Sequence, residues 1–225
     1  MRCQQDLCKT DEVIIVSGGS IDEEVLDCVI REHKDAYIIG VDRGLDILYR
    51  CDIKPQFIIG DFDSVSIEAK QTYDSFENVI TLDSDKDYTD THVAVEKALD
   101  LSPGRIIILG ATGGRLDHFL ENLNLLKICL DNGVEAEIID RQNKIRLINE
   151  KKELIIRRKA LYGKYISAIP FSDCVSGIEL SGFKYNLSDA VLDKDMTLGV
   201  SNELVKEEGL IKVGKGYLLV LETKD

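Results

Sequence analysis

Two kinds of hydrophobic pattern divide this chain of 225 residues, and the change from one to the other near residue 142 constrains its fold most. In the first part, short β-branched runs such as residues 13–16 alternate with longer segments such as 117–133, whose apolar residues recur at helical spacing. Continuous apolar runs of strand length are typical of buried parallel strands. The alternation therefore predicts a doubly wound, mainly parallel sheet with flanking helices.

The individual elements of this first part follow from the same patterns. We expect strands at 13–19, 36–42, 56–61, 78–82, 105–110 and 136–140, and helices at 21–33, 45–50, 91–101 and 117–133. Asp90 is expected to cap the start of the third helix, and Asn132 with Gly133 the end of the fourth.

From residue 143 onward the runs are short, partly alternating and separated by Gly, Asn, Asp or Lys. This pattern is typical of an antiparallel β-sandwich or barrel. We therefore expect an α/β domain over residues 1–142 and an antiparallel β-sandwich over 143–225, packed without a flexible linker. Residues 1–12 are expected to form a disordered leader ahead of the first strand.

Charge and cysteine usage exclude several classes of protein. The 41 acidic against 28 basic residues argue against nucleic acid or an anionic membrane as a partner. The longest apolar runs have the length of strands, so no membrane span is expected, and the N-terminus has no apolar core of a signal peptide. The six cysteines are scattered without a CxxC pair, which indicates reduced thiols and a cytoplasmic location.

Acidic residues are concentrated just after several predicted strands, in segments 60–64, 83–90 and 110–119. In an open parallel sheet the carboxyl ends of the strands face one crevice, where ligands bind. The carboxylates gathered there would be Asp61, Asp63, Asp83, Asp85, Asp87, Asp90 and Asp117. They would repel one another without cations, and Mg²⁺ binds through one or two carboxylates, waters and substrate phosphates. The pattern therefore indicates an enzyme that uses Mg²⁺ and a nucleotide.

The two acidic turns allow simpler interpretations as well. If the chain is extended at Phe62, Asp61 and Asp63 point to the same side and share a cation; the alternative is a solvated Asx turn. Asp90 is accounted for by helix capping alone. Capping does not explain the acidic residues crowded before it, which favours the metal interpretation.

Glycine turns supply the expected phosphate contacts. Gly113 and Gly114 precede the longest helix, where free backbone N–H groups attract phosphate and Arg115 clamps its oxygens. Gly18 and Gly19 follow the first strand and either cradle phosphate or only start a helix. Neither a Walker A loop nor a GxGxxG motif occurs.

Further residues are expected at the same rim. Asp42 ends the second strand and Gly44 lies in the turn after it, and His118 and Asn122 share one helix face. Taken alone, His118 also fits a packed histidine of the core.

Together these motifs run in the order found in bacterial thiamine pyrophosphokinases, which the chain resembles over nearly its whole length. The motifs are SGGS (17–20), VDRG (41–44), GDFDS (60–64), DKDYTD (85–90), TGGRLDHFLEN (112–122), KYISAIPF (164–171), LSGFKYNL (180–187) and VSNE (200–203). The resemblance implies transfer of the pyrophosphoryl group of ATP to the hydroxyl of thiamine, giving thiamine diphosphate and AMP. It also implies Mg²⁺ and a homodimer, with each active site formed by the α/β domain of one subunit and the β-sandwich of the other.

The resemblance places Asp42, Asp61, Asp63, Asp87, Asp90 and Asp117 at the family's acidic magnesium and substrate positions, and Ser201 and Asn202 in the segment that contacts thiamine. The chemistry of the motifs supplies the other expected roles. Catalytic roles fall on Asp61, Asp63, Asp90, Asp117 and Arg115, and Mg²⁺ binding on Asp61, Asp63 and Asp90. Contacts to ATP fall on Gly18, Gly19, Asp42, Gly44, Asp87, Thr89, Gly113, Gly114, His118 and Asn122, and contacts to thiamine on Ser201 and Asn202. Either Asp90 or Asp117 would accept the proton of the hydroxyl.

Two departures from the family pattern and two rival functions remain open. The second motif is commonly ADGG or ADGA but here contains Arg43, and the chain has no Trp to stack on thiamine. A related enzyme would use the same MgATP chemistry on another alcohol, such as a pterin. A non-catalytic sensor would bind thiamine or nucleotide without releasing AMP.

Overall fold

A computed structural model describes residues 10–82 and 87–225 of the chain. The chain divides into two compact units, Met1–Arg141 and Gln142–Asp225, which we call the α/β unit and the β unit. Asp83, Asp85 and the first nine residues of the expected leader lie outside the described residues.

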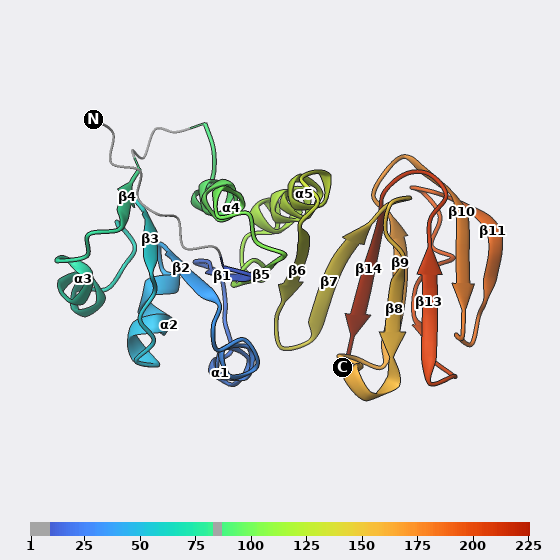
Figure 1. Ribbon diagram of the computed structural model, residues 1–225, viewed down its shortest axis with the longest axis horizontal. Helices are drawn as coiled ribbons and strands as arrows, with labels where there is room; N and C mark the ends of the chain where they lie inside the picture. Colours follow the sequence, from blue (N-terminus) through green and yellow to red (C-terminus); the bar gives the residue numbers. More distant parts are fainter. Residues whose placement is uncertain (1–9, 83–86) are drawn as a thin grey trace. The chain divides into compact units, whose positions relative to one another are not determined.

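The α/β unit alternates strands and helices along the chain (Figure 1). Its strands are β1 (Glu12–Val16), β2 (Tyr37–Val41), β3 (Phe57–Gly60), β4 (Val79–Thr81), β5 (Arg105–Leu109) and β6 (Glu135–Ile139). Its helices are α1 (Glu23–Glu32), α2 (Gly44–Arg50), α3 (Ile67–Tyr73), α4 (Asp90–Asp100) and α5 (Leu116–Asp131). The expected strand positions and the doubly wound fold class are confirmed.

The strands of this unit form a parallel sheet in the order β6-β5-β1-β2-β3-β4. β1 and β5 lie at its centre, and Ile14, Ile15, Ile107 and Ile108 are completely buried there. Burying one such side chain contributes about 1.5–3 kcal/mol, so these two strands stabilise the centre of the unit. This explains why both strands read as unbroken apolar runs in the sequence.

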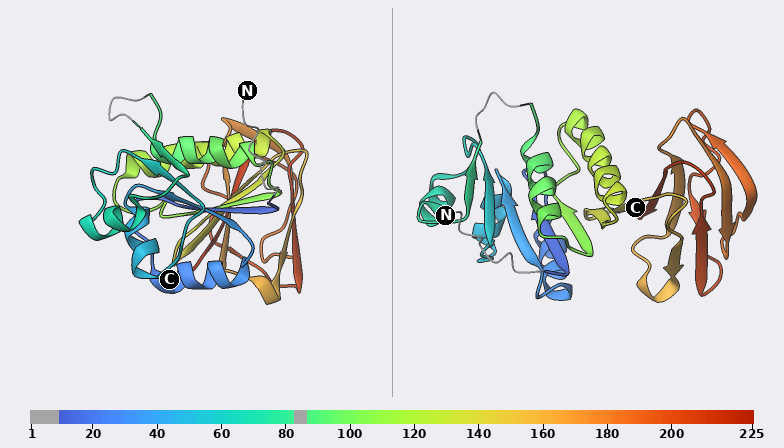
Figure 2. Two further views of the ribbon diagram at one scale, coloured as in Figure 1. Left: turned by 60° about the vertical axis from the view of Figure 1, so that its left-hand side comes forward. Right: turned by 45° about the horizontal axis from the view of Figure 1, so that its top comes forward.

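Helices cover both faces of this sheet. Figure 2 shows α4 and α5 along one face and α1 and α2 along the opposite face. The chain winds in one direction from β1 to β4 and then returns to the other side of β1 as β5. The strand order therefore reverses between β1 and β5, and ligands of such sheets bind at the carboxyl ends of the strands beside this reversal.

The ends of α4 and α5 show how the sequence sets helix boundaries. The N-cap of α4 is Thr89, whose hydroxyl accepts a hydrogen bond from the backbone N–H of His92 at 3.2 Å. The expectation that Asp90 is the cap is therefore wrong by one residue: Asp90 is the first residue inside the helix. At the end of α5, the N–H groups of Gly133 and Val134 bond back into the last turn, as expected for an Asn-Gly terminus.

Helix α3 has no counterpart among the predicted helices. Ser66 caps it by accepting a hydrogen bond from the N–H of Ala69 at 3.3 Å. Only Ala69 and Tyr73 are buried, whereas Ile67 is 70% exposed. So few buried positions do not make a recognisable apolar stripe.

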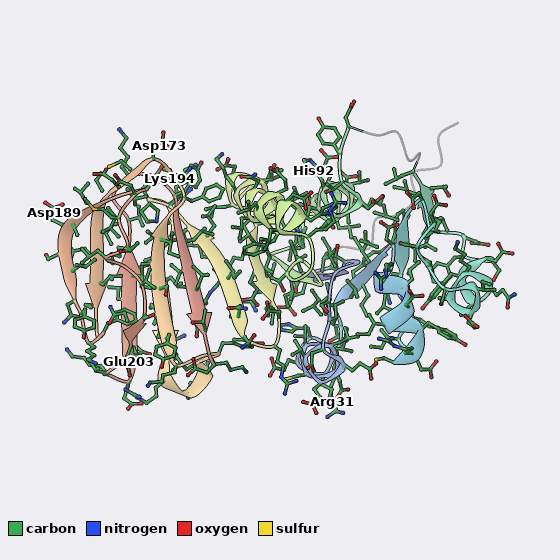
Figure 3. The ribbon with its side chains drawn as sticks, turned by 180° about the vertical axis from the view of Figure 1, so that it is seen from behind. Arg31, His92, Asp173, Asp189, Lys194 and Glu203 are labelled. Carbon is green, nitrogen blue, oxygen red and sulfur yellow. The ribbon has the colours of Figure 1, made fainter. Side chains whose placement is uncertain are left out.

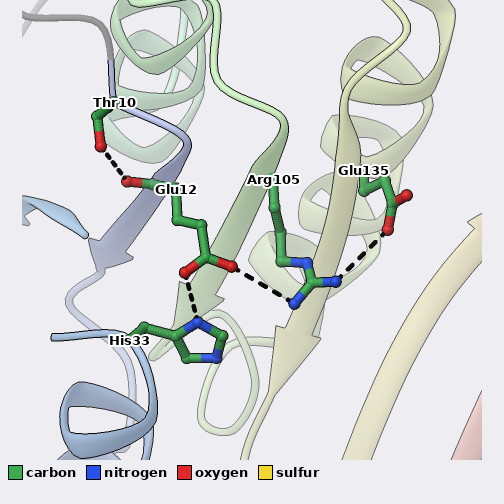
Figure 4. Close-up of polar contacts among 5 residues, drawn as sticks. All are labelled: Thr10, Glu12, His33, Arg105 and Glu135. Atoms are coloured by element: carbon green, nitrogen blue, oxygen red, sulfur yellow. Dashed lines mark hydrogen bonds and ion pairs between the residues drawn. The ribbon is translucent and has the colours of Figure 1, made fainter. Parts of the chain in front are cut away.

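The amino ends of the central strands carry a chain of polar contacts (Figure 4). Glu12 of β1 contacts the His33 ring at 2.7 Å and the Arg105 guanidinium at 3.5 Å, and Arg105 reaches Glu135 at 3.7 Å. These residues join the starts of β1, β5 and β6 to the end of α1. A hollow of about 750 Å³, lined among others by Asp11, Glu12 and Arg105, lies at this edge and is called the amino-edge hollow below.

The β unit consists of two antiparallel sheets. Its strands are β7 (Asn143–Ile148), β8 (Leu154–Arg157), β9 (Tyr165–Pro170), β10 (Cys174–Ser181), β11 (Leu187–Asp193), β12 (Asn202–Glu203), β13 (Glu208–Lys212) and β14 (Leu218–Thr223). One sheet has the order β12-β9-β14-β7 and the other β11-β10-β13-β8. Both sheets supply the residues of one apolar core, whose largest member is Phe183, only 2% exposed. The expected β-sandwich is confirmed.

Two further observations bear on the expectations from composition. None of the helices in the described part of the chain is long and apolar enough to cross a membrane. Cys28, Cys51, Cys129 and Cys174 are free thiols. Burial raises the pKa of the Cys129 thiol to about 12, which makes it unreactive.

Candidate active site

A cleft of about 960 Å³ opens in the α/β unit beside the reversal of the strand order. It is lined by the turns that follow β1, β2 and β5 and by the first turns of α4 and α5. We call it the carboxyl-edge cleft. The site residues predicted from the sequence that line it are Gly18, Gly19, Asp42, Asp87, Thr89, Asp90, Gly113, Gly114, Arg115, His118 and Asn122.

Two glycine turns meet directly at this cleft. The N–H of Gly19 donates to the carbonyl of Gly110 at 2.9 Å, which ties the turn after β1 to the turn after β5. A Cβ at Gly19 would lie only 2.3 Å from that carbonyl oxygen, so no larger residue fits there without moving backbone. The close approach brings the turn at residues 18–20 next to the turn at 110–115 and forms one continuous surface for a ligand.

Buried hydroxyl and amide groups fix the floor of the cleft. The hydroxyls of Ser17 and Thr91 lie 2.5 Å apart and join the end of β1 to the first turn of α4. The amide of Asn122 donates to the carbonyl of Ala111 at 2.9 Å, and Thr112 donates to Asp140 at 2.6 Å. Asn122 therefore holds the turn after β5 in place from α5.

The GDFDS segment approaches the cleft through Asp42. A Cβ at Gly60 would lie 2.1 Å from Oδ1 of Asp42, so the Asp42 carboxylate rests against the backbone at the end of β3. Phe62 has a φ of 61°, and the N–H of Asp63 donates to Oδ1 of Asp61 at 3.0 Å. The chain is thus not extended at Phe62, and Asp61 closes an Asx turn. Ser64, at the end of this segment, lines the cleft.

The first turn of α5 presents an arginine paired with an aspartate. Arg115 lines the cleft, and its guanidinium donates to both carboxylate oxygens of Asp117, at 3.2 and 2.6 Å. The hydrogen bond from Arg115 and the backbone N–H of His118 lower the pKa of Asp117 to about 2. His118 is exposed and lines the cleft, so the alternative of a packed core histidine does not hold.

Several predicted site residues lie outside the lining of the cleft. Gly44 is buried at the start of α2, and Asp61, Asp63 and Asp117 are not among the lining residues. Within residues 10–82 and 87–225, no three His, Cys, Asp or Glu side chains lie close enough to form a metal-binding group on their own. Asp61, Asp63 and Asp90 therefore do not form a metal-binding group by their side chains alone.

The two predicted thiamine residues belong to the β unit. Ser201 is exposed with a φ of 58°, and its N–H donates to the Ser167 hydroxyl at 3.0 Å. Asn202 is buried: its Oδ1 accepts from the N–H of Tyr185 at 3.0 Å, and its Nδ2 donates to the carbonyl of Tyr185 at 2.7 Å. The N–H of Glu203 (Figure 3) also donates to that Oδ1, at 2.9 Å. The Asn202 amide thus holds the segment that presents Tyr185, whose side chain is 61% exposed.

These bonds predict a stability effect for Asn202→Ala. The change leaves two N–H groups and one carbonyl without their partner, and we expect the free energy of unfolding to fall by about 1–3 kcal/mol. Chemical denaturation measures the difference. Asn124→Ala, on the exposed face of α5, is the control and should change stability by less than about 0.5 kcal/mol. Equal effects of the two changes would contradict a structural role for Asn202.

The sequence assigns no role to several residues that line the cleft, notably Ser17, Ser64, Tyr88, Thr91 and Phe119. Ser17 and Ser64 belong to the SGGS and GDFDS motifs, so the hydroxyls of these motifs were a usable signal. Thr91 carries no such signal, because its partner Ser17 is 74 residues away in the chain.

The fold and the cleft define a doubly wound α/β protein with an acidic, glycine-walled ligand site and a second, antiparallel β unit. Comparison with known families gives a match over each unit. Residues 31–138 match the model "Thiamin pyrophosphokinase, catalytic domain", and residues 151–218 match "Thiamin pyrophosphokinase, vitamin B1 binding domain".

Individual relatives agree with these matches. The chain is 35% identical to "Thiamine pyrophosphokinase" of Bacillus subtilis over 83% of its own length and 87% of that protein's. A crystal structure of thiamine pyrophosphokinase from the same organism has a TM-score of 0.84 at 32% identity, covering 95% of this chain and 99% of that one. The structure from Geobacillus thermodenitrificans gives 0.82 at 31% identity, covering 95% and 98%. The chain belongs to the thiamine pyrophosphokinase family. The family expected from the motifs of its sequence is confirmed.

Proposed function

We propose that this protein is a thiamine diphosphokinase: it transfers the pyrophosphoryl group of ATP to the hydroxyl of thiamine and releases AMP. The family membership supports the reaction. The observation that carries the assignment of the site is the meeting of the turns after β1 and β5 beside Asp90, in one cleft at the carboxyl edge of the sheet. Anionic phosphates are bound at such edges by free backbone N–H groups.

Within this cleft the triphosphate would be held by the turns at residues 18–20 and 110–114. The first turn of α5 offers backbone N–H groups, and Arg115 offers a fixed positive charge. Charges placed in advance where negative charge develops are the main source of rate enhancement in phosphoryl-type transfer. The thiamine hydroxyl would attack the β-phosphorus in line and give its proton to Asp90 or Asp117. The bond from the β-phosphorus to the oxygen that bridges the α- and β-phosphorus would break, and AMP would leave with that oxygen.

The oxygen donors at the cleft fit Mg²⁺, which prefers hard ligands. Asp42, Asp87 and Asp90 line the cleft, and the Asp42 carboxylate rests against the start of the GDFDS segment. Asp90, with Asp61 and Asp63, would hold the ion, and substrate phosphates would complete its coordination, since the side chains alone form no ready site. When bound, Mg²⁺ would neutralise charge on the polyphosphate.

The thiamine side of the reaction is assigned to the β unit. Ser201 and the segment held by Asn202 would contact thiamine. The backbone of Tyr185 is hydrogen-bonded to Asn202, and its ring is exposed, so it offers an aromatic surface beside them. Leu198, Val200 and Val205 are also exposed and lie within a few residues of Ser201 in the sequence. An interface over this segment would cover these apolar side chains. We propose a cytoplasmic homodimer with shared active sites, as the resemblance implies.

A product assay tests the reaction. The protein is incubated with MgATP and thiamine, and the products are identified by mass. We expect AMP and thiamine diphosphate in equal amounts. ADP with thiamine monophosphate would contradict pyrophosphoryl transfer, a pterin alcohol consumed in preference to thiamine would indicate the related enzyme, and binding without AMP release would indicate a sensor.

A further inference from the structure

Two hydrogen bonds join the Arg115 guanidinium to the Asp117 carboxylate, and they bear on the roles of both residues. Nε of Arg115 donates to Oδ1 of Asp117 at 3.2 Å, and Nη2 donates to Oδ2 at 2.6 Å. A pairing through two parallel bonds fixes the plane of the guanidinium as well as its distance. Both side chains are largely exposed, at 72% and 62%, so packing does not hold the arginine in place.

The pairing with Asp117 leaves part of the Arg115 guanidinium available to a ligand. A guanidinium carries five N–H donors, and two of them point at Asp117. The other three, on Nη1 and on the second position of Nη2, remain for a ligand. Because Arg115 lines the carboxyl-edge cleft, these donors can meet phosphate oxygens there.

Asp117 accepts one further hydrogen bond. Its Oδ1 also accepts the backbone N–H of His118 at 2.9 Å, in the first turn of α5 where the helix favours negative charge. The two contacts keep the pKa of the carboxyl near 2, so Asp117 is ionised at every pH at which the enzyme would work. A carboxylate whose pKa is that low accepts a proton poorly at neutral pH.

We propose that Asp117 is a positioning residue, which fixes the guanidinium of Arg115 so that its remaining edge faces the nucleotide phosphates. This inference rests on the proposed function and deepens it. Asp117 does not line the cleft, and both of its oxygens already accept hydrogen bonds from Arg115 or His118, so Asp90, which lines the cleft, is the better placed of the two candidates for the base. In this account Asp117 acts on the reaction only through Arg115.

A double-mutant cycle tests this dependence. We compare the wild type, Asp117→Asn, Arg115→Ala and the double variant by kcat and KM for MgATP between about pH 5 and 9. Arg115→Ala should lower kcat/KM about 10²-fold or more. Asp117→Asn should lower it about 10- to 100-fold, because the arginine is then misplaced. The double variant should equal Arg115→Ala alone, since Asp117 has no role without the arginine.

The same measurements contain the results that would overturn the proposal. If the two losses multiply, or if Asp117→Asn removes the acidic limb of the pH profile, Asp117 acts directly in catalysis. Asp117→Glu should recover part of the lost rate, because its carboxylate still reaches Arg115. The control is Asp131→Asn on the same helix, which breaks an exposed ion pair with Lys127 and should leave kcat unchanged.

Failure of the proposed function would be recognised separately. If the wild type forms no diphosphate product, the cycle is repeated on the affinity for an ATP analogue with carbon in its α,β bridge, measured by calorimetry with Mg²⁺ present. Non-additive losses of affinity would still support the positioning role. Additive losses, or an unchanged affinity in Asp117→Asn, would overturn it.

Discussion

Asp90→Asn is expected to lower kcat by about 10²-fold or more while the protein stays folded. Asp90 is the first residue of α4 and lines the cleft. Asparagine has nearly the same shape but carries no charge, so it holds a cation poorly and does not accept a proton. Steady-state release of AMP measures the effect.

Asp61→Asn should give a loss of kcat of similar size if Asp61 shares the ion, although its side chain closes a turn beside the cleft.

The matched control for this prediction is Asp100→Asn, at the opposite end of the same helix. Asp100 is exposed and lies outside the cleft, at the carboxyl end of α4, where the helix disfavours negative charge. Its removal should leave kcat unchanged and stability equal or slightly higher. Turnover close to wild type in a folded Asp90→Asn variant would count against the assigned role of Asp90.

Gly19→Ala is expected to lower the free energy of unfolding more than Asn202→Ala or Gly18→Ala. The new Cβ would lie 2.3 Å from the Gly110 oxygen and 3.0 Å from the Thr112 oxygen, and both are backbone atoms that cannot rotate away. The turns after β1 and β5 must separate, which strains the centre of the unit and weakens the bond between Gly19 and Gly110. We expect a loss of about 2–4 kcal/mol in the free energy of unfolding, measured by chemical denaturation.

Gly18→Ala separates this clash from a general effect of replacing glycine. Its Cβ would meet Arg43 and Asp42 at 3.5–3.7 Å, which is ordinary contact. The stability of this variant should change by less than about 1 kcal/mol. If Gly18→Ala and Gly19→Ala are equally stable, the close approach of the two turns does not govern the cleft.

The fold could be predicted from the sequence where burial is complete. After the charged residues Glu12 and Arg105 at their amino ends, β1 and β5 are buried on both faces, so the remaining residues are all apolar and the strands stood out in the sequence. Helix α3 could not be recognised because it buries only Ala69 and Tyr73. Local signals also placed the start of α4 one residue late, since Thr89 and Asp90 are both good caps and only the hydrogen bond to His92 distinguishes them.

The site was predictable where a motif lies in one turn and less so where it depends on backbone conformation. Gly113, Gly114 and Arg115 follow one another, and all line the cleft. The direction of Asp61 and Asp63 depends on the left-handed conformation of Phe62, which a non-glycine residue rarely adopts. The pair of Ser17 and Thr91 arises only when distant parts of the chain meet, so no local pattern indicates it.

The location of the nucleotide is the central claim, and amide hydrogen exchange followed by mass spectrometry tests it most directly. The protein is compared with and without Mg²⁺ and an ATP analogue that carries carbon in its α,β bridge, which blocks transfer. We expect slower exchange at residues 17–20 and 110–115, in the two turns of the carboxyl-edge cleft. Protection confined to residues 10–12 and 104–105, at the amino-edge hollow at the opposite ends of the strands, would contradict the assignment.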